Sequence, residues 1–260
     1  MSEVVPLPNS GGDPKREIIK TPTLDTIHGL INQVQRNPKL GILVIIGPPG
    51  VGKTTSLEAY QRGRPADYCK MTTAHDSLGT GLRHIGKAMG IDLLDTMASK
   101  MFDILARVMC ERASSRAPGR RPILMIDEAQ DMSDRLIQTI RSLHDRCNEG
   151  NDKPGYGLVL CGNATFPERF SRARFEQLRD RIFMIWTVKE PEIGDLEAIC
   201  QHFGITDERA VKLLERQALT GSLRRVVRIM ETARLAPGPK RPLDAQAIAS
   251  TIEHLGYVKN

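Results

Sequence analysis

The sequence predicts an α/β fold, in which a parallel sheet is sandwiched between helices and followed by a small all-helical domain. Three observations lead to this prediction. Apolar runs of strand length alternate with helix-forming segments, these runs are continuous rather than alternating with polar residues, and after Pro191 only helical periodicity remains. Continuous β-branched runs are typical of parallel strands covered on both faces, and strands that alternate with helices indicate βαβ units.

The expected elements follow from these patterns in chain order. A helix begins at Thr23 and ends before Pro38, and a buried strand follows over 41–46. The same reasoning predicts the remaining elements of the first part. They are a helix after Gly52, strands over 67–71, 123–126, 156–161 and 182–187, helices over 78–89, 97–112 and 135–147, and an arginine-rich helix before the last strand. Four further helices are expected, over 192–203, 206–219, 222–235 and 243–255.

Changes in pattern divide the chain into three expected parts. Residues 1–20 contain several Pro and Gly residues and are interpreted as a flexible leader. Residues 21–188 are expected to form the α/β core, and residues 189–260 a helical lid domain.

Composition favours a soluble globular protein. The 260 residues are 40% apolar and 26% charged, and the sequence has no run of about 18 apolar residues that could span a bilayer. The N-terminus carries Pro, Gly and charge where a signal peptide has an apolar segment, so we expect a cytoplasmic protein. The five cysteines are odd in number and lack metal-ligand spacing, which indicates small buried side chains rather than disulfides or zinc ligands.

The charge balance is modestly basic. Lys and Arg number 37 against 31 Asp and Glu, a net charge of +6, which mildly favours a polyanionic partner. Basic residues concentrate within 169–181 and within 221–241. Such clusters are about as typical of solvated helix faces as of binding surfaces.

A phosphate-binding loop is the strongest signal in the chain. The segment between the first strand and the following helix fits G-x-x-x-x-G-K-[ST] at every fixed position. Glycines let backbone N–H groups turn toward a phosphate, Lys53 reaches the β- and γ-phosphates, and Thr54 ligates Mg²⁺. The predicted nucleotide-binding residues are Gly47, Pro48, Pro49, Gly50, Val51, Gly52, Lys53, Thr54 and Thr55.

Two carboxylates follow a buried strand about seventy residues later. Asp127 and Glu128 end the run that starts at Ile123, so they are expected at the carboxyl edge of the sheet, where open α/β sheets bind ligands. In this place Asp127 is predicted to hold Mg²⁺, and Glu128 to orient the water that attacks the γ-phosphate. Without a phosphate loop, such a pair is usually an ordinary solvated strand end.

A polar residue also ends the next strand. Asn163 follows Gly162, where its side chain can hydrogen-bond the γ-phosphate or the attacking water. Gly-Asn is equally a turn-forming pair, so both interpretations stay open.

Together these motifs resemble an AAA+ ATPase, a P-loop NTPase fold. Their order implies Walker A, Walker B, sensor 1 at Asn163, an arginine finger in the arginine-rich segment, and sensor 2 at Arg224, which follows Gly221. Within the superfamily, GPPGVGKTT, LMIDEAQDM and LVLCGNATF are most similar to the transposition ATPases, the family of the phage Mu B protein, TnsC and TniB. The resemblance covers about residues 22–236.

The resemblance implies a function and its partners. It implies ATP and Mg²⁺ as cofactors, hydrolysis of ATP to ADP and phosphate, and a homo-oligomer, ring or filament, on double-stranded DNA without sequence preference. It also implies delivery of target DNA to a transposase. For the arginine finger we favour Arg181 and then Arg179, which directly precede the last strand. Thr72–His75 follow the second strand and are a candidate lining for a DNA-facing pore, together with Lys70, Arg83 or Lys100.

Two other functions stay open. A helicase loader or replication initiator shares the nucleotide motifs, but normally brings a recognisable DNA-binding domain or partner-binding tail. A nucleotide-gated signalling ATPase has the same motifs without contacting DNA.

Overall fold

The computed structural model describes residues 17–62, 64–115, 120–148, 155–235 and 243–257. They fall into two compact units, which we describe separately. The sheet unit comprises Ile27–Gly47 and Ser56–Thr187; the helical unit comprises the residues before Ile27, Pro48–Thr55, and the chain from Val188 onward. Most of the expected leader lies outside the described residues, and the domain limits expected from the sequence stay a prediction.

Five parallel strands form the sheet unit, in the order β2-β3-β4-β1-β5. The three central strands are buried along their whole length, as expected for apolar runs covered on both faces. Since all strands run the same way, their carboxyl ends meet at one edge and their amino ends at the other. The strands are β1 (Ile42–Ile46), β2 (Ala66–Lys70), β3 (Ile123–Asp127), β4 (Gly157–Gly162) and β5 (Ile182–Thr187).

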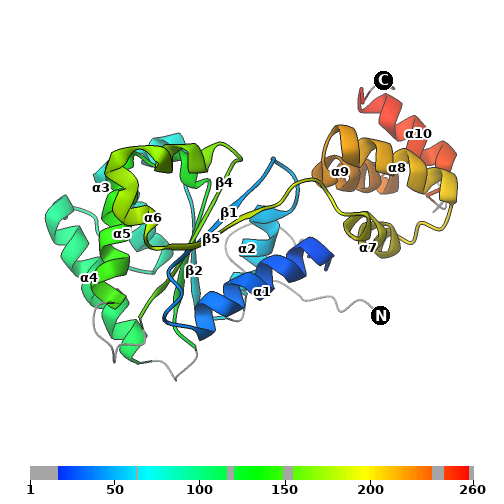
Figure 1. Ribbon diagram of the computed structural model, residues 1–260. Coiled ribbons are helices and arrows are strands. Elements are labelled where there is room, and N and C mark those ends of the chain that lie inside the picture. The colour runs from blue at the N-terminus through cyan, green and yellow to red at the C-terminus, as the bar shows by residue number, and fades with distance from the viewer. Residues whose placement is uncertain (1–16, 63, 116–119, 149–154, 236–242, 258–260) are drawn as a thin grey trace. The chain divides into compact units, whose positions relative to one another are not determined.

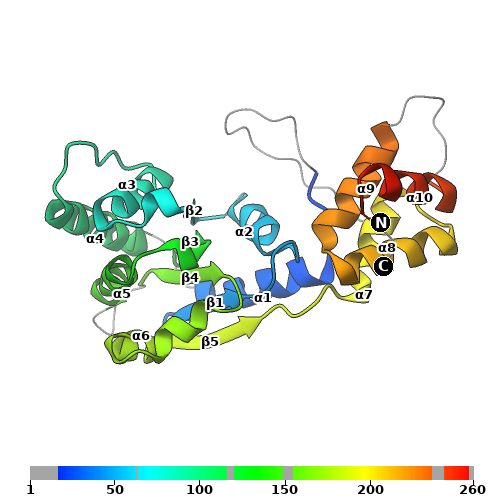
Figure 2. The same ribbon diagram turned by 90° about the horizontal axis from the view of Figure 1, so that it is seen from above.

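Helices cover both faces of this sheet (Figures 1 and 2). On one face lie α3 (Leu78–Ala88), α4 (Ala98–Ser114) and α5 (Asp134–Asn148). The other face is covered by the parts of α1 (Pro22–Arg36) and α2 (Lys53–Gln61) that belong to this unit. The predicted three-layer α/β fold is therefore confirmed.

The prediction of one arginine-rich helix before β5 is wrong. The segment forms two 3₁₀ turns, η3 (Phe166–Ser171) and η4 (Ala173–Phe175), and a single α-helical turn, α6 (Glu176–Arg179). Arg172 is extended, with φ −70° and ψ 140°, which interrupts helical continuity. The aromatic residues Phe166, Phe170 and Phe175 are buried, so contacts with the core decide the conformation rather than local helix propensity.

The helical unit has a core of its own. It contains α7 (Ile193–Phe203), α8 (Glu208–Thr220), α9 (Leu223–Leu235) and α10 (Ala245–His254), which confirms the expected helical tail. The fully buried Asp195 of α7 accepts hydrogen bonds from Thr23 N at 2.9 Å and Thr23 Oγ1 at 2.6 Å. These bonds tie the start of α1 to α7.

The composition predicts no membrane span and buried cysteines. Among the described residues, every helix is too short or too polar to cross a membrane. Four cysteines are buried, whereas Cys110 is half-buried and its Sγ lies 3.3 Å from Sγ of Cys147.

Candidate nucleotide site

The phosphate loop follows β1 directly and leads into α2. Gly50 and Gly52 have φ values of +80° and +98°, in the left-handed region that favours glycine. A Cβ added at Gly50 would meet the Ser222 side chain at 2.5 Å, so this position excludes a side chain for steric reasons as well. The loop conformation thus depends on glycines where the motif has them.

Burial and a hydrogen bond fix two side chains of the loop, those of Val51 and Lys53. Val51 is buried with 2% of its surface exposed, and Lys53, the first residue of α2, donates from Nζ to Pro48 O at 2.7 Å. Thr54 is half-buried, and Thr55 is exposed. The helix start provides backbone N–H groups and a positive dipole end, so the loop fits a phosphate group.

The beginning of α9 touches this loop within the helical unit. Arg224 N donates to Gly50 O at 3.3 Å, and the space that a side chain at Gly50 would need is filled by Ser222. The backbone of Arg224, the candidate sensor-2 residue, therefore lies beside the loop, and the residue is exposed.

At the carboxyl edge of the sheet, Asp127 is the last residue of β3 and is 2% exposed. Its Oδ2 accepts a hydrogen bond from the Tyr68 hydroxyl at 3.1 Å, and its Oδ1 accepts one from Glu128 N at 2.9 Å. Burial and then the Asp127 charge raise the pKa of Tyr68, so the phenol stays protonated and donates. The carboxylate is thereby fixed in orientation.

Glu128 sits in a strained backbone conformation and is held by a neighbour. Its φ of +51° and ψ of +41° are uncommon outside glycine. Gln130 donates from Nε2 to Glu128 Oε2 at 2.7 Å, and Gln130 Oε1 accepts from Asn163 N at 3.1 Å. Thr165 donates from Oγ1 to Asn163 Oδ1 at 3.0 Å. One amide side chain therefore connects the two predicted site residues at the ends of β3 and β4.

Sequence reasoning missed Gln130. Its position two residues after Glu128 in Asp-Glu-Ala-Gln was visible, but its link to Asn163 spans 33 residues and depends on β3 pairing with β4.

The carboxylate oxygens at this edge are the kind of ligand that a hard cation prefers. Magnesium usually binds one or two carboxylates together with waters and phosphate oxygens, rather than an all-protein cage. The described residues contain no group of three or more His, Cys, Asp or Glu arranged to hold a metal. The buried, oriented carboxylate of Asp127 fits an ion of this kind.

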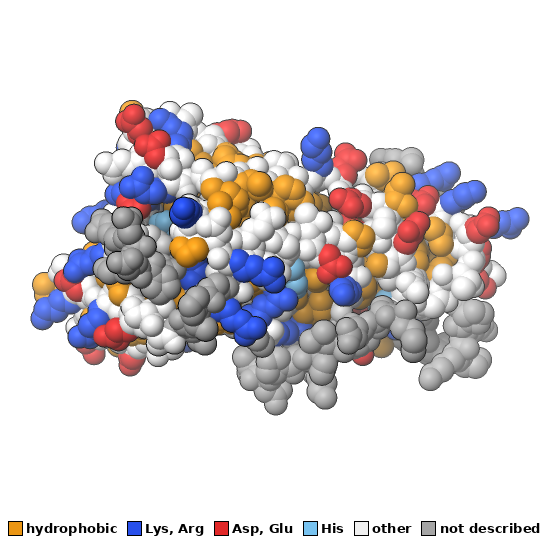
Figure 3. Space-filling model, turned by 60° about the horizontal axis from the view of Figure 1, so that its bottom comes forward, with side chains coloured by type: hydrophobic (Ala, Val, Ile, Leu, Met, Phe, Trp, Pro, Cys, Tyr) orange, Lys and Arg blue, Asp and Glu red, His pale blue; other side chains and the backbone are white. Residues whose placement is uncertain are grey.

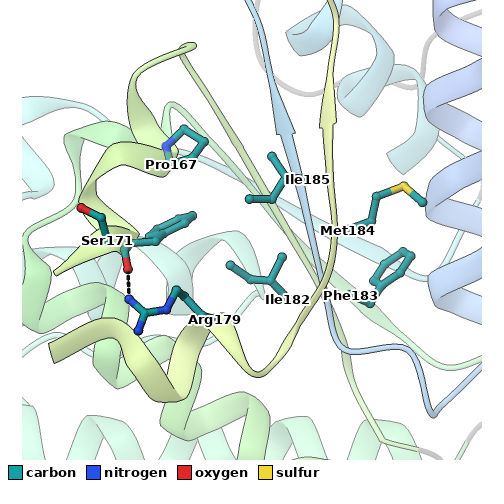
Figure 4. A pocket seen from close by; sticks show the side chains of 8 residues that line it. Pro167, Ser171, Arg179, Ile182, Phe183, Met184 and Ile185 are labelled. Atoms are coloured by element: carbon teal, nitrogen blue, oxygen red, sulfur yellow. Dashed lines mark hydrogen bonds between the residues drawn. The ribbon is translucent and has the colours of Figure 1, made fainter. Parts of the chain in front are cut away.

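The candidate finger arginines lie at the start of β5, at the opposite edge of the sheet. Arg181 donates from Nε to Asp145 Oδ1 at 2.9 Å, and its side chain is 47% exposed. Arg179 donates from Nη1 to Phe170 O at 2.5 Å and lines a groove of about 360 Å³ beside the apolar side chains of β5 (Figure 4).

The other three arginines of this segment converge on Asp134 at the start of α5. Arg172 and Arg174 pair with it at 3.1 and 2.9 Å, and Arg169 forms a shorter contact. Burial acts to raise the pKa of Asp134, but the hydrogen bond from Arg169 and the three positive charges outweigh it and lower the pKa. These arginines hold the segment to α5.

Comparison with known proteins identifies the family. Residues 38–170 match the family described as AAA domain. The ATP-dependent target DNA activator B of Escherichia phage Mu is 25% identical over 181 residues, which cover 68% of this chain and 54% of the activator. Replication factor C subunit 4 of Oryza sativa subsp. japonica is 24% identical over 111 residues, 43% of this chain and 29% of that protein.

Among solved structures, the Aeropyrum pernix ORC2 protein matches 90% of this chain and 68% of its own, with a TM-score of 0.67 and 15% identity. This match concerns the fold alone. The chain spans about half the length of the Mu activator and less than a third of the rice protein. The family match covers just over half of the chain and the resemblance noted in the sequence is confirmed: the chain belongs to the AAA domain family and is similar to AAA+ ATPases of the transposition-regulator type.

Proposed function

We propose that the chain is an ATP hydrolase that binds double-stranded DNA without sequence preference, assembles on it as a homo-oligomer, and selects or delivers target DNA to a transposase. The observation that carries this proposal is the 25% identity over 181 residues with a protein described as an ATP-dependent target DNA activator. The loop conformation and the oriented carboxylates support the nucleotide chemistry.

Each candidate residue has a distinct role in this proposal. The loop binds the phosphates through its backbone, and Lys53 adds a positive charge at the β- and γ-phosphates. Thr54 and Asp127 hold Mg²⁺, which would neutralise charge on the phosphate oxygens when bound. Glu128, positioned by Gln130, accepts a hydrogen bond from the attacking water, and Asn163 contacts that water or the γ-phosphate.

Arginines supply the remaining positive charge. The backbone N–H of Arg224 bonds the phosphate loop, which supports a role near the phosphates of the nucleotide bound by its own chain. Arg181 and Glu128 belong to opposite edges of one sheet, which supports action of Arg181 on the nucleotide of a neighbouring copy. Arg179 is the second choice, since its guanidinium already donates to Phe170 O.

A filter-binding experiment tests the DNA-binding part. Two unrelated duplexes are titrated with the full chain in a slowly hydrolysed ATP analogue, in ADP and without nucleotide. We expect tight binding of both duplexes with the analogue only, and a steep loss of affinity with salt because phosphate contacts release counterions. Binding without nucleotide dependence, or of one sequence alone, contradicts the proposal. Electron microscopy of the same mixtures tests for a ring or filament.

A replication function is the second candidate, favoured by the similarity to replication factor C subunit 4. A loader that acts in replication prefers a primer–template junction or one origin sequence to plain duplex. Adding both substrates to the titration separates the two functions. A signalling ATPase without DNA contact retains no DNA on the filter under any of these conditions.

A further inference from the structure

The amino edge of the sheet concentrates basic side chains. The segments that precede β1, β2 and β3 are residues 36–41, 61–65 and 120–122, and they contain six Lys or Arg residues but no Asp or Glu. The strands are parallel, so these segments meet at one edge. Five of the six form what we call the basic edge: Arg36, Lys39, Arg62, Arg64 and Arg120.

The sixth basic residue, Arg121, is 2% exposed and connects two of the segments through hydrogen bonds. It donates from Nε to Val34 O at 2.6 Å, from Nη1 to Pro38 O at 3.3 Å and from Nη2 to Leu40 O at 2.7 Å. Because Arg121 bonds the residues on either side of Lys39, its exposed neighbour Arg120 lies close to the turn that carries Lys39.

A second set of contacts brings the end of α2 onto α1. Asn32 Oδ1 accepts hydrogen bonds from the Tyr60 hydroxyl at 2.9 Å and from Arg64 Nη1 at 3.2 Å. The Arg64 guanidinium lies 4.3 Å from the centre of the Tyr60 ring. Burial raises the pKa of Tyr60, while the charges of Arg64 and Arg36 oppose this rise, so both cations lie near the same ring. The basic side chains are thus gathered around the end of α1.

Carboxylates do little to balance this charge. Asp67, in β2, is engaged by Arg112 at 3.1 Å and by the Tyr156 hydroxyl. Glu58 lies one helical turn before Arg62 and is the acid that acts on it. Nη1 of Arg62 is buried and has no hydrogen-bond partner among the described residues.

We infer that the basic edge is a contact surface for the phosphate backbone of duplex DNA. This assignment rests on the DNA binding proposed above and names where that binding occurs. Figure 3, which brings the bottom of the Figure 1 view forward, shows Lys and Arg side chains gathered on the part of this face that belongs to the sheet unit. Basic residues on several segments follow a phosphate backbone without reading bases.

Two observations favour DNA over a protein partner. None of the large apolar side chains exposed among the described residues belongs to these three segments, whereas protein interfaces have an apolar centre. The edge also lies one strand length from the carboxyl edge, about 16 Å for five residues at 3.3 Å each. ATP at the carboxyl edge leaves this surface accessible.

A triple variant tests the assignment. Arg36→Gln, Lys39→Gln and Arg120→Gln remove three exposed charges together. Each lost phosphate contact lowers the slope of log affinity against log salt by about 0.9, so we expect a slope reduced by about 2 to 3 and affinity at least about tenfold lower at 0.1 M salt. ATP hydrolysis without DNA and the thermal unfolding temperature should stay unchanged.

A control with the same change in net charge comes from α8, where Arg209→Gln, Lys212→Gln and Arg216→Gln remove three exposed charges. It should bind DNA like the wild type; an equal loss in both variants overturns the assignment because net charge alone then explains the effect. Full affinity in the edge variant overturns it as well. Failure of the wild type to bind DNA refutes the proposed function instead.

Discussion

The two edges of the sheet differ in charge and in how their side chains are held. At the carboxyl edge, Asp127 and Glu128 are fixed by Tyr68, by Gln130 and by a left-handed backbone. At the amino edge, Arg36, Lys39, Arg64 and Arg120 are exposed around a framework built by Arg121. A reaction site needs groups fixed in position, whereas a surface for a charged polymer needs mainly charge density.

The largest expected effect comes from Arg181, which belongs to the amino edge but is proposed to complete the carboxyl-edge site of a neighbour. An arginine finger is worth about 10³- to 10⁵-fold in hydrolysis, so Arg181→Ala should nearly abolish the rate measured by phosphate release. The ion pair between Arg181 and Asp145 is partly exposed, and Asp145 still pairs with Arg141 in this variant. We therefore expect the variant to fold.

Mixing two inactive variants sharpens this test. Arg181→Ala retains Glu128, and Glu128→Gln retains Arg181, so mixed interfaces should recover part of the ATPase activity. A mixture that co-assembles and stays inactive contradicts action between copies, or transfers the role to Arg179.

Glu128→Gln should come next in magnitude. Loss of a general base lowers rates by about 10²- to 10⁴-fold, while the phosphate contacts remain, so nucleotide affinity should be retained. Lys53→Ala is the contrasting variant, because it removes a phosphate contact and should abolish binding of a fluorescent ATP analogue. Wild-type affinity in Lys53→Ala rules out the loop as the nucleotide site.

Arg121 tests the framework of the amino edge. Arg121→Met leaves the carbonyl groups of Val34 and Leu40 without their donor, and each unsatisfied buried group costs about 1–3 kcal/mol. We expect the free energy of unfolding, measured by urea titration, to fall by about 3 kcal/mol. The neighbouring Arg120→Gln is the matched control and should change it by less than about 0.5 kcal/mol. Equal stability of the two variants contradicts the role given to Arg121.

Gln130 tests the positioning of Glu128. Gln130→Ala removes both of its hydrogen bonds, to Glu128 and Asn163, and we expect kcat to fall about tenfold with KM unchanged. Gln201→Ala, an exposed glutamine on α7, should leave both parameters at wild-type values. A change confined to KM would assign Gln130 to nucleotide binding instead.

The smallest effect concerns pH and His144 on α5. Burial lowers the pKa of this side chain, and the nearby charges of Arg121 and Arg181 lower it further, against the effect of Asp145. Below pH 6.5 the unfolded chain therefore takes up more protons at His144 than the folded chain. Stability should fall by up to about 1.4 kcal/mol per pH unit there.

The variant His144→Gln should show a flatter profile between pH 6.5 and pH 5. Asp134 and Asp145 have lowered pKa values, so their stabilising contribution is lost only as the pH falls below about 4, outside this range. Parallel profiles above pH 5 contradict the account of His144.

Local patterns were sufficient to predict most of the fold. The strand before the phosphate loop and the strand ending in Asp127 are short apolar runs whose burial follows from their own residues. The segment before β5 was predicted wrongly because three buried aromatic residues and contacts of Arg169 with residues over 30 positions away override its local propensity.

The functional surfaces were predicted unevenly for a related reason. The phosphate loop and the acidic pair are contiguous in sequence. The basic edge combines residues from 36–41, 61–65 and 120–122, and only the strand order and the bonds of Arg121 show that these segments meet. The role of Gln130 likewise depends on the pairing of β3 with β4.

The DNA affinity of the Glu128→Gln variant in ATP and in ADP tests the central claim most directly, because this variant is expected to hold ATP without hydrolysing it. We predict tight, lasting retention of duplex DNA with ATP, and affinity weaker by about 5- to 150-fold with ADP, the usual range for coupling between two sites. Equal affinity in the two nucleotides would contradict an ATPase that controls DNA binding.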